Sequence, residues 1–103
     1  MKRIFVCSPF AGDIARNVRV AEALCRRVMR SGHAPFAPHL LYPTLTEDSV
    51  PEQRETGSAC GLAYMECCDE VWAFTGNGIS SGMRRELDRA GQLGKPILEI
   101  AEV

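Results

Sequence analysis

Short apolar runs alternate with longer amphipathic segments along the whole chain. Four stretches are rich in apolar residues and bounded by charged, Gly or Pro residues: 4–7, 34–38, 70–75 and 97–100. The continuous apolar runs 4–7 and 71–74 are typical of strands buried on both faces of a parallel sheet. Because Pro35 and Pro38 cannot donate ladder hydrogen bonds, we expect the second strand to lie at a sheet edge.

Amphipathic helices are predicted between these strands. After Asp13, apolar residues recur at helical spacing and predict a helix of about 16 residues that stops at Ser31 and Gly32. Ser49 and Glu52 form an S-x-x-E capping-box pattern, and the helix that it starts is expected to reach Cys67 or Cys68. The apolar positions of the third helix are Met83, Leu87, Ala90 and Leu93.

Two glycines on the second helix bear on packing and assembly. Gly57 and Gly61 lie four residues apart, which suggests that this helix packs closely on a sheet or on a partner subunit. A four-stranded sheet buries little surface on its own. We therefore expect a homo-oligomer, most simply a two-fold dimer.

The alternation of strands and helices predicts the fold class. Strand–helix alternation repeated three times is the pattern of a parallel sheet covered by helices on both faces. Right-handed crossovers favour a flavodoxin-like three-layer α/β sandwich with a mainly parallel sheet of order 2-1-3-4. The chain of 103 residues is long enough for one such domain, spanning residues 1–103.

Charge and composition exclude several classes of function. The 12 basic and 13 acidic residues give a formal net charge of −1, so no basic field favours nucleic acid or an anionic membrane. The five cysteines lack the paired spacing of a metal site, and we expect buried thiols in a reducing cytoplasm and no metal or other cofactor. No apolar run approaches the ~20 residues of a membrane span, and the first residues lack the features of a signal peptide.

The strongest candidate site follows the third strand. Residues 76–82 are rich in Gly and Ser, and they lead into the first turn of the third helix at Ser80, Ser81, Gly82 and Met83. Unpaired N–H groups and partial positive charge at a helix N-terminus bind phosphate, although serine there also serves simply as a cap. Glu86 lies four residues after Gly82 and faces the same way, as a nucleophile, a base or a solvated carboxylate.

The loop after the first strand is the second candidate. It and the following helix offer Ser8, Gly12, Asp13 and Asn17 as substrate ligands, with Asp13 either capping the helix or binding a sugar hydroxyl. In a 2-1-3-4 sheet the two loops meet at the switch point, where ligands bind in such folds. The long connection from residue 39 to residue 50 is also expected to serve a site or an interface.

Taken together, these segments resemble a known superfamily. The opening IFVCSPFAGD with Asn17, the helix start PEQRETG, the strand CDEVWAF, and the segments GISSGMRREL and GKPI are similar to nucleoside 2-deoxyribosyltransferase-like domains, most of all the short bacterial and phage domains of unassigned function. The resemblance implies that Glu86 attacks the anomeric carbon and displaces the base. It also implies that Ser8, Ser80 and Gly82 correspond to sugar- or phosphate-binding residues of the relatives.

The resemblance does not identify the residue that donates a proton to the leaving base. Polar residues that the relatives use in their site fall on Ile4, Phe10 and Gly61, so the acid that assists the leaving base would be Asp13, Glu52, Glu55 or a group of a partner subunit. A partner subunit is also expected to contribute Tyr42, Glu52 or Glu55. At the start of the second helix, Glu52, Arg54 and Glu55 form either a polar wall of a neighbouring subunit's pocket or simply a charged first turn. We predict an N-glycosidic-bond enzyme for a nucleoside or its 5′-phosphate, and the alternatives are a non-catalytic nucleotide-binding or sensing module and an oligomeric scaffold.

Overall fold

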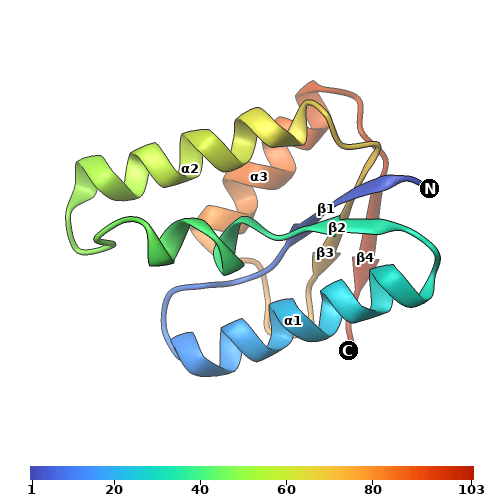
Figure 1. Ribbon diagram of the computed structural model, residues 1–103, viewed down its shortest axis with the longest axis horizontal. Coiled ribbons are helices and arrows are strands. Elements are labelled where there is room, and N and C mark those ends of the chain that lie inside the picture. The colour runs from blue at the N-terminus through green and yellow to red at the C-terminus, as the bar shows by residue number, and fades with distance from the viewer.

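The computed structural model describes residues 1–103 as a four-stranded sheet between two layers of helices (Figure 1). The strands are β1 (Arg3–Cys7), β2 (Ala34–Phe36), β3 (Glu70–Phe74) and β4 (Ile97–Ile100). Their order is β2-β1-β3-β4, and every neighbouring pair is parallel. The predicted fold class and strand order are therefore confirmed, with a sheet that is entirely parallel.

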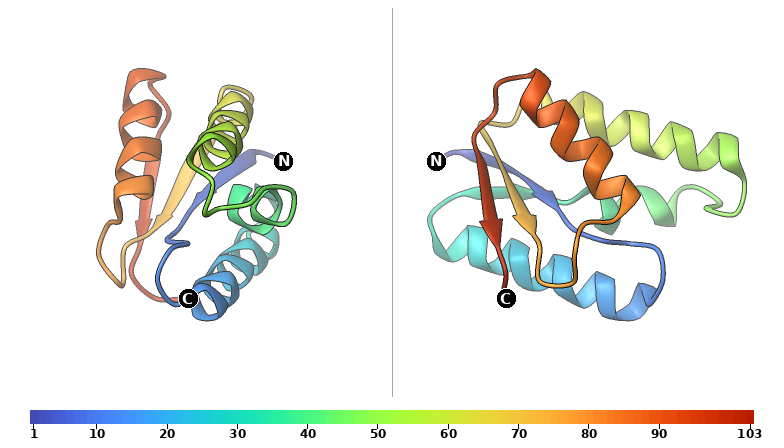
Figure 2. Two further views of the ribbon diagram at one scale, coloured as in Figure 1. Left: turned by 90° about the vertical axis from the view of Figure 1, so that its left-hand side faces the viewer. Right: turned by 180° about the vertical axis from the view of Figure 1, so that it is seen from behind.

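The three helices cover both faces of the sheet. They are α1 (Ile14–Arg30), α2 (Pro51–Met65) and α3 (Ser81–Gln92). Figure 2 shows α1 on one face and α3 on the other, and α2 packs on the same core as α3. None of these helices is long and apolar enough to cross a membrane.

The position of β1 inside the sheet, with a core on each face, explains why its sequence is a continuous apolar run. Ile4 and Val6 pack with Leu24 and Val28 of α1, in a core that also contains Trp72. Phe5 and Cys7 point to the opposite face, into the core that α3 covers with Met83 and Leu87. Because successive side chains of a strand alternate between faces, a strand covered on both sides needs apolar residues throughout.

The predicted caps of α1 are present, and the capping box predicted for α2 is wrong. Asp13 caps α1 by accepting the Arg16 N–H at 3.1 Å, and Ser31 ends this helix. The predicted capping box of Ser49 is not formed, because Val50 occupies the cap position without a side-chain hydrogen bond. The Ser49 hydroxyl instead donates to the Glu47 carboxylate at 3.2 Å, within the turn that precedes α2.

The glycine face of α2 packs within the chain, which corrects the expected sheet or subunit contact. The connection after β2 forms two short 3-10 helices, η1 (Pro38–Leu40) and η2 (Tyr42–Thr44). A Cβ at Gly61 would lie 3.0 Å from Pro38 Cβ, and one at Gly57 would lie 3.5 Å from Tyr42 Cβ. The two glycines therefore admit this connection against α2. The homo-oligomer stays a prediction that no longer draws on this helix face.

Candidate functional site

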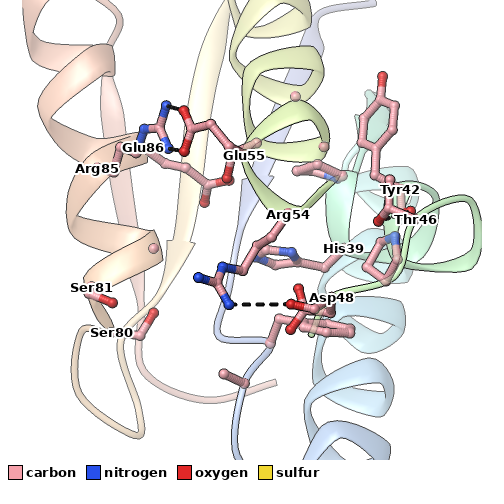
Figure 3. A pocket seen from close by; sticks show the side chains of 18 residues that line it. His39, Tyr42, Thr46, Asp48, Arg54, Glu55, Ser80, Ser81, Arg85 and Glu86 are labelled. Carbon is pink, nitrogen blue, oxygen red and sulfur yellow. Dashed lines mark hydrogen bonds and ion pairs between the residues drawn. The ribbon is translucent and has the colours of Figure 1, made fainter. Parts of the chain in front are cut away.

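A cavity of about 420 Å³ opens at the carboxyl end of the sheet, between the loop after β1, the η1–η2 connection, α2 and the start of α3 (Figure 3). The first loop contributes Phe10 and Ala11 to its wall. The connection contributes residues from Pro38 to Asp48, and α2 contributes residues from Arg54 to Gly61. Because loops at the switch point of a parallel sheet create such crevices, the position is typical of a ligand site in this architecture.

Glu86 is the buried ionisable residue of the cavity. Its side chain points from α3 toward α2 (Figure 3), only 9% of the residue is exposed, and its Oε1 atom has no hydrogen-bond partner. Burial raises the pKa of Glu86 from its ordinary 4.5 to about 8, against the opposing effects of the Cys7 thiol and the Arg85 guanidinium. Buried polar atoms in native proteins are almost always paired, so an unpartnered carboxylate oxygen that faces a cavity is free to contact a ligand there.

Cys7 lies beneath Glu86 at the end of β1. Its thiol is fully buried and lies 3.9 Å from the Met83 carbonyl oxygen. Burial, together with the neighbouring Glu86 charge, raises the pKa of Cys7 well above its ordinary range, so the thiol stays neutral. The floor under Glu86 is therefore uncharged.

The N-terminus of α3 forms the opposite end of the cavity. Ser80 caps the helix, since its Oγ accepts the Met83 N–H at 3.2 Å. Ser81 and Gly82 follow as the first helical residues, both exposed and both lining the cavity. The first N–H groups of a helix have no intrahelical partner, so this end offers donors and partial positive charge to an anion.

An aromatic pair forms part of the wall opposite α3. The rings of Phe10 and His39 stack with centroids 5.4 Å apart and an interplanar angle of 30°. Burial lowers the pKa of His39, although the Ser8 backbone and the Asp48 charge oppose this shift. His39 is therefore a neutral imidazole at neutral pH, and the pair presents a flat, uncharged surface.

A bidentate ion pair joins α2 to α3 beside Glu86. The Arg85 guanidinium contacts both Glu55 carboxylate oxygens, at 2.6 and 2.9 Å (Figure 3). The hydrogen bond from Arg85 lowers the pKa of Glu55, and the same contact raises the pKa of Arg85. Glu55 is therefore an ionised partner of Arg85 at neutral pH and holds no proton to donate.

The structure brings together half of the residues that the sequence singled out. Those that line the cavity are Tyr42, Glu55, Ser80, Ser81, Gly82 and Glu86. Tyr42 and Glu55 do so in their own chain, where the sequence interpretation had assigned them to a partner subunit. The residues that do not line it are Ser8, Gly12, Asp13, Asn17, Glu52 and Met83.

The residues outside the cavity have local reasons for their positions. Asp13 is the cap of α1, Met83 points into the core below α3, and Glu52 is an exposed residue in the first turn of α2. Gly12 adopts a φ of 99°, a conformation that side chains rarely take, and so supports the turn before α1. Ser8 is fully buried, and its Oγ has no hydrogen-bond partner.

The Asn17 side chain holds the loop after β1 in place through two hydrogen bonds. Its Nδ2 donates to the Phe10 and Ala11 carbonyl oxygens at 3.0 and 3.1 Å, and the residue is only 7% exposed. An Asn17→Ala variant leaves both carbonyls without this donor, so we expect a loss of about 1–3 kcal/mol in the free energy of unfolding. Urea denaturation measures this loss, and an unchanged midpoint would contradict the assigned role.

Sequence reasoning missed several cavity residues and misplaced others. Arg54 lines the cavity of its own chain, and Thr46 and Asp48 line it without having been predicted. Phe10 and Gly61 line it where the relatives were expected to carry polar residues. Ile4 instead faces the α1 core. The only feature of the sequence that indicated a site or an interface at the connection 39–50 was the length of this segment. No group of three or more His, Cys, Asp or Glu side chains is arranged to hold a metal ion.

Comparisons with known proteins agree with this architecture. Residues 2–100 match the family described as a domain of unknown function (DUF7768). No curated protein matches the chain.

Two of the solved structures that match the chain illustrate its fold. One is a 2-deoxyribosyltransferase from Bacillus psychrosaccharolyticus, 24% identical with a TM-score of 0.71 over 98% of this chain and 75% of the other. The second is the CMP N-glycosidase BcmB from Clostridium botulinum, 21% identical with a TM-score of 0.55 over 95% of this chain and 67% of the other. The chain thus belongs to the family of the domain of unknown function DUF7768, and it has a 2-deoxyribosyltransferase-like fold.

Proposed function

We propose that the chain breaks or exchanges the N-glycosidic bond of a nucleoside or nucleoside 5′-phosphate, with Glu86 as the nucleophile. The observation that carries the proposal is the Glu86 carboxylate, which is buried, has an unpartnered oxygen and lines a cavity of about 420 Å³. The shared fold of a 2-deoxyribosyltransferase and a CMP N-glycosidase supports the same class of substrate.

The proposed reaction has two steps. A Glu86 carboxylate oxygen forms a bond to C1′ as the bond from C1′ to the base nitrogen breaks, and the electron pair leaves with the base. Water then attacks C1′ and releases Glu86, or a second base does so and completes a transfer. Nucleophilic attack needs the ionised carboxylate, and the positive charge that develops on the sugar stabilises this ionised form in the transition state.

The proton for the leaving base is the open part of this scheme. Of the acids considered from the sequence, Asp13 and Glu52 do not line the cavity. Glu55 lines it, but its pKa is lowered by the ion pair with Arg85. We therefore assign no protein acid, and in the proposal the base takes its proton from water in the cavity.

A second function, ligand binding without turnover, is favoured by the pKa of Glu86. With this pKa raised to about 8, the carboxyl group is mostly protonated at neutral pH. A protonated carboxyl donates a hydrogen bond to a ligand and is not a nucleophile. The two functions differ in a simple outcome, because only the enzyme releases free base.

The direct test is base release from a panel of substrates. Purified protein is incubated with the common 2′-deoxynucleosides, their 5′-monophosphates, cytidine and CMP, and free base is measured by chromatography. The proposal expects release from at least one member. Binding by calorimetry without release from any member would overturn the enzymatic proposal in favour of the binding module.

The pH dependence of the reaction follows from the ionisation of Glu86. Because the ionised form is the reactive one and burial raises the pKa of Glu86 to about 8, kcat/KM is expected to rise with pH below 8 and to level off above it. Well below the pKa, the rise is about tenfold per pH unit. Initial rates at low substrate concentration between pH 5.5 and 9.5 measure this profile. A kcat/KM that falls as pH rises from 6 to 8 would contradict a carboxylate nucleophile.

A further inference from the structure

The Glu86 carboxyl group has no ionic partner, although its neighbour in the chain is an arginine that lines the same cavity. Its Oε1 atom is buried without a hydrogen-bond partner, and Glu86 forms none of the four ion pairs in the structure. A buried carboxylate is costly unless a cation pairs with it. The position of the Arg85 guanidinium therefore needs an explanation.

Arg85 is held by Glu55 across the space between α3 and α2. Its Nη2 and Nη1 atoms donate to the two Glu55 carboxylate oxygens at 2.6 and 2.9 Å, a bidentate contact that lies beside Glu86 (Figure 3). The side chains of Arg85 and Glu55 are 45% and 63% exposed, so water screens the pair. Both of the atoms with which Arg85 forms this contact are thus turned to Glu55 and not to the carboxyl group of Glu86.

Three titratable groups around Glu86 are neutral at neutral pH. Burial raises the pKa of the Cys7 thiol beneath it at the end of β1 and that of the Tyr42 phenol in the connection after β2. Burial also lowers the pKa of His39, against the opposing effects of the Ser8 backbone and the Asp48 charge. None of these groups supplies a positive charge to Glu86.

Two charges of opposite sign lie together on the far wall of the cavity. The Arg54 Nη1 atom donates to the main-chain carbonyl oxygen of Asp48 at 3.3 Å (Figure 3), and both residues line the cavity. The positive charge of Arg54 and the negative charge of Asp48 therefore largely offset each other. Burial is the main influence on the pKa of Glu86 and raises it, and Arg85 is the cation that opposes this effect.

We propose that Glu55 is a positioning residue for Glu86, because it holds the Arg85 guanidinium in an ion pair and so leaves the Glu86 carboxyl group free to meet the substrate. The inference rests on the proposed function for the role of Glu86 as the nucleophile. It adds a residue of α2 that acts on the site through Arg85 without touching the reacting atoms. Without Glu55, Glu86 is the remaining carboxylate whose charge acts on Arg85.

Removal of either half of the pair is expected to move the ionisation of Glu86 in opposite directions. In Glu55→Gln, Arg85 has lost its partner and stabilises ionised Glu86, so the titration midpoint of Glu86 falls. In Arg85→Gln, this cation is gone and the Glu55 carboxylate is left unpaired nearby, so the midpoint rises. Each shift is expected to reach at least about 0.5 pH unit, since a neighbouring charge has a larger effect than this before water screens it.

The titration is measured without any need for turnover. NMR follows the side-chain carboxyl carbon of Glu86 in carbon-13-labelled protein from pH 5 to 10, and Glu86→Gln assigns the resonance. Where base is released, the plateau of kcat/KM at high pH is expected to be at least about fivefold lower in Glu55→Gln, because an ion pair stabilises the ground state of the nucleophile.

A second ion pair between the same parts of the chain provides the matched control. Arg89 of α3 contacts Glu66, just after α2, at 3.2 Å, with side chains 36% and 57% exposed. Neither residue lines the cavity. Glu66→Gln and Arg89→Gln make the same changes in charge and are expected to leave the midpoint of Glu86 where it is in the wild type. Circular dichroism checks that each variant is folded.

Failure of this inference is separable from failure of the proposed function. Shifts of the same sign in Glu55→Gln and Arg85→Gln, as a general loosening between α2 and α3 would produce, would overturn the inference even if base is released. Shifts no larger than those of the two control variants would also overturn it. Opposite shifts in a protein that releases no base from any substrate would support the control of Glu86 by Glu55 and overturn the enzymatic function.

Discussion

A Glu86→Gln variant is expected to release base at least about a thousandfold more slowly than the wild type while keeping its fold. Removal of a covalent nucleophile has effects of this size or larger, because the residual rate comes only from substrate binding and orientation. Glutamine keeps the shape of the buried side chain, so the cores around Met83 and Leu87 stay packed. Chromatographic measurement of free base, with the wild type at the same concentration, gives the ratio.

A matched control separates this effect from a general loss of charge. Glu22 is an exposed glutamate of α1, on the opposite face of the sheet from the cavity. Glu22→Gln makes the same change in net charge and is expected to leave the rate within twofold of the wild type. A Glu86→Gln variant that releases base as fast as Glu22→Gln would contradict the role of Glu86.

The second large expected effect is a decrease in the free energy of unfolding of the wild type as pH rises. Because burial raises the pKa of Glu86 from 4.5 to about 8, the folded protein holds this proton over a range in which the unfolded chain has already lost it. The free energy of unfolding contributed by Glu86 is therefore fully present below pH 4.5 and is lost as the pH rises toward 8. The loss is on the order of 5 kcal/mol, since each unit of difference between the folded and unfolded pKa values corresponds to about 1.4 kcal/mol.

The difference between two proteins isolates this contribution. Glu86→Gln carries no titrating group at this position, so its stability lacks the loss that the wild type shows as pH rises. Glu55 and Glu70 have lowered pKa values and gain stability with pH near their ordinary range, but they do so in both proteins and cancel in the difference. Urea denaturation from pH 4 to 9 measures both curves. Parallel curves would contradict a buried, unpartnered carboxyl group.

Much of the fold was predictable because the two central strands, β1 and β3, are covered on both faces. Residues 4–7 and 71–74 are buried without interruption, and this leaves an apolar run that no surface strand would show. Helix ends were predictable where a side chain caps them, as Asp13 and Ser80 do. The predicted capping box at Ser49 is not formed, because the Ser49 hydroxyl donates its hydrogen bond to the Glu47 carboxylate in the preceding turn. The S-x-x-E pattern alone does not distinguish a serine that caps a helix from one that bonds within a turn.

The candidate site was less predictable than the fold. The helix terminus at Ser80 and the carboxylate of Glu86 follow from spacing along one helix, and both line the cavity. The opposite wall is made by the two 3-10 helices, whose prolines and short length give no periodic signal. The glycines of α2 were misinterpreted for the same reason. Their lack of a Cβ admits Pro38 and Tyr42, and no local pattern identifies which segment fills that space.

The orphaned polar atoms are a property of the three-dimensional structure alone. Ser8 and Glu86 are ordinary residue types in the sequence, and the absence of hydrogen-bond partners emerges only when the elements around them are packed. The ion pair that holds Arg85 at Glu55 is likewise visible only once α2 and α3 are packed together. The unpartnered Glu86 oxygen carries the proposed function, and a search for motifs could not have supplied it.

The most direct measurement is the covalent state of Glu86 during turnover. The protein is mixed with a substrate whose base it releases, quenched in acid within the first turnovers, digested and examined by mass spectrometry. The account predicts that the peptide containing Glu86 gains the mass of the sugar, with its phosphate where present, and that Glu86→Gln shows no such gain. Base release by the wild type with no adduct on this peptide, and at an equal rate in Glu86→Gln, would contradict the account.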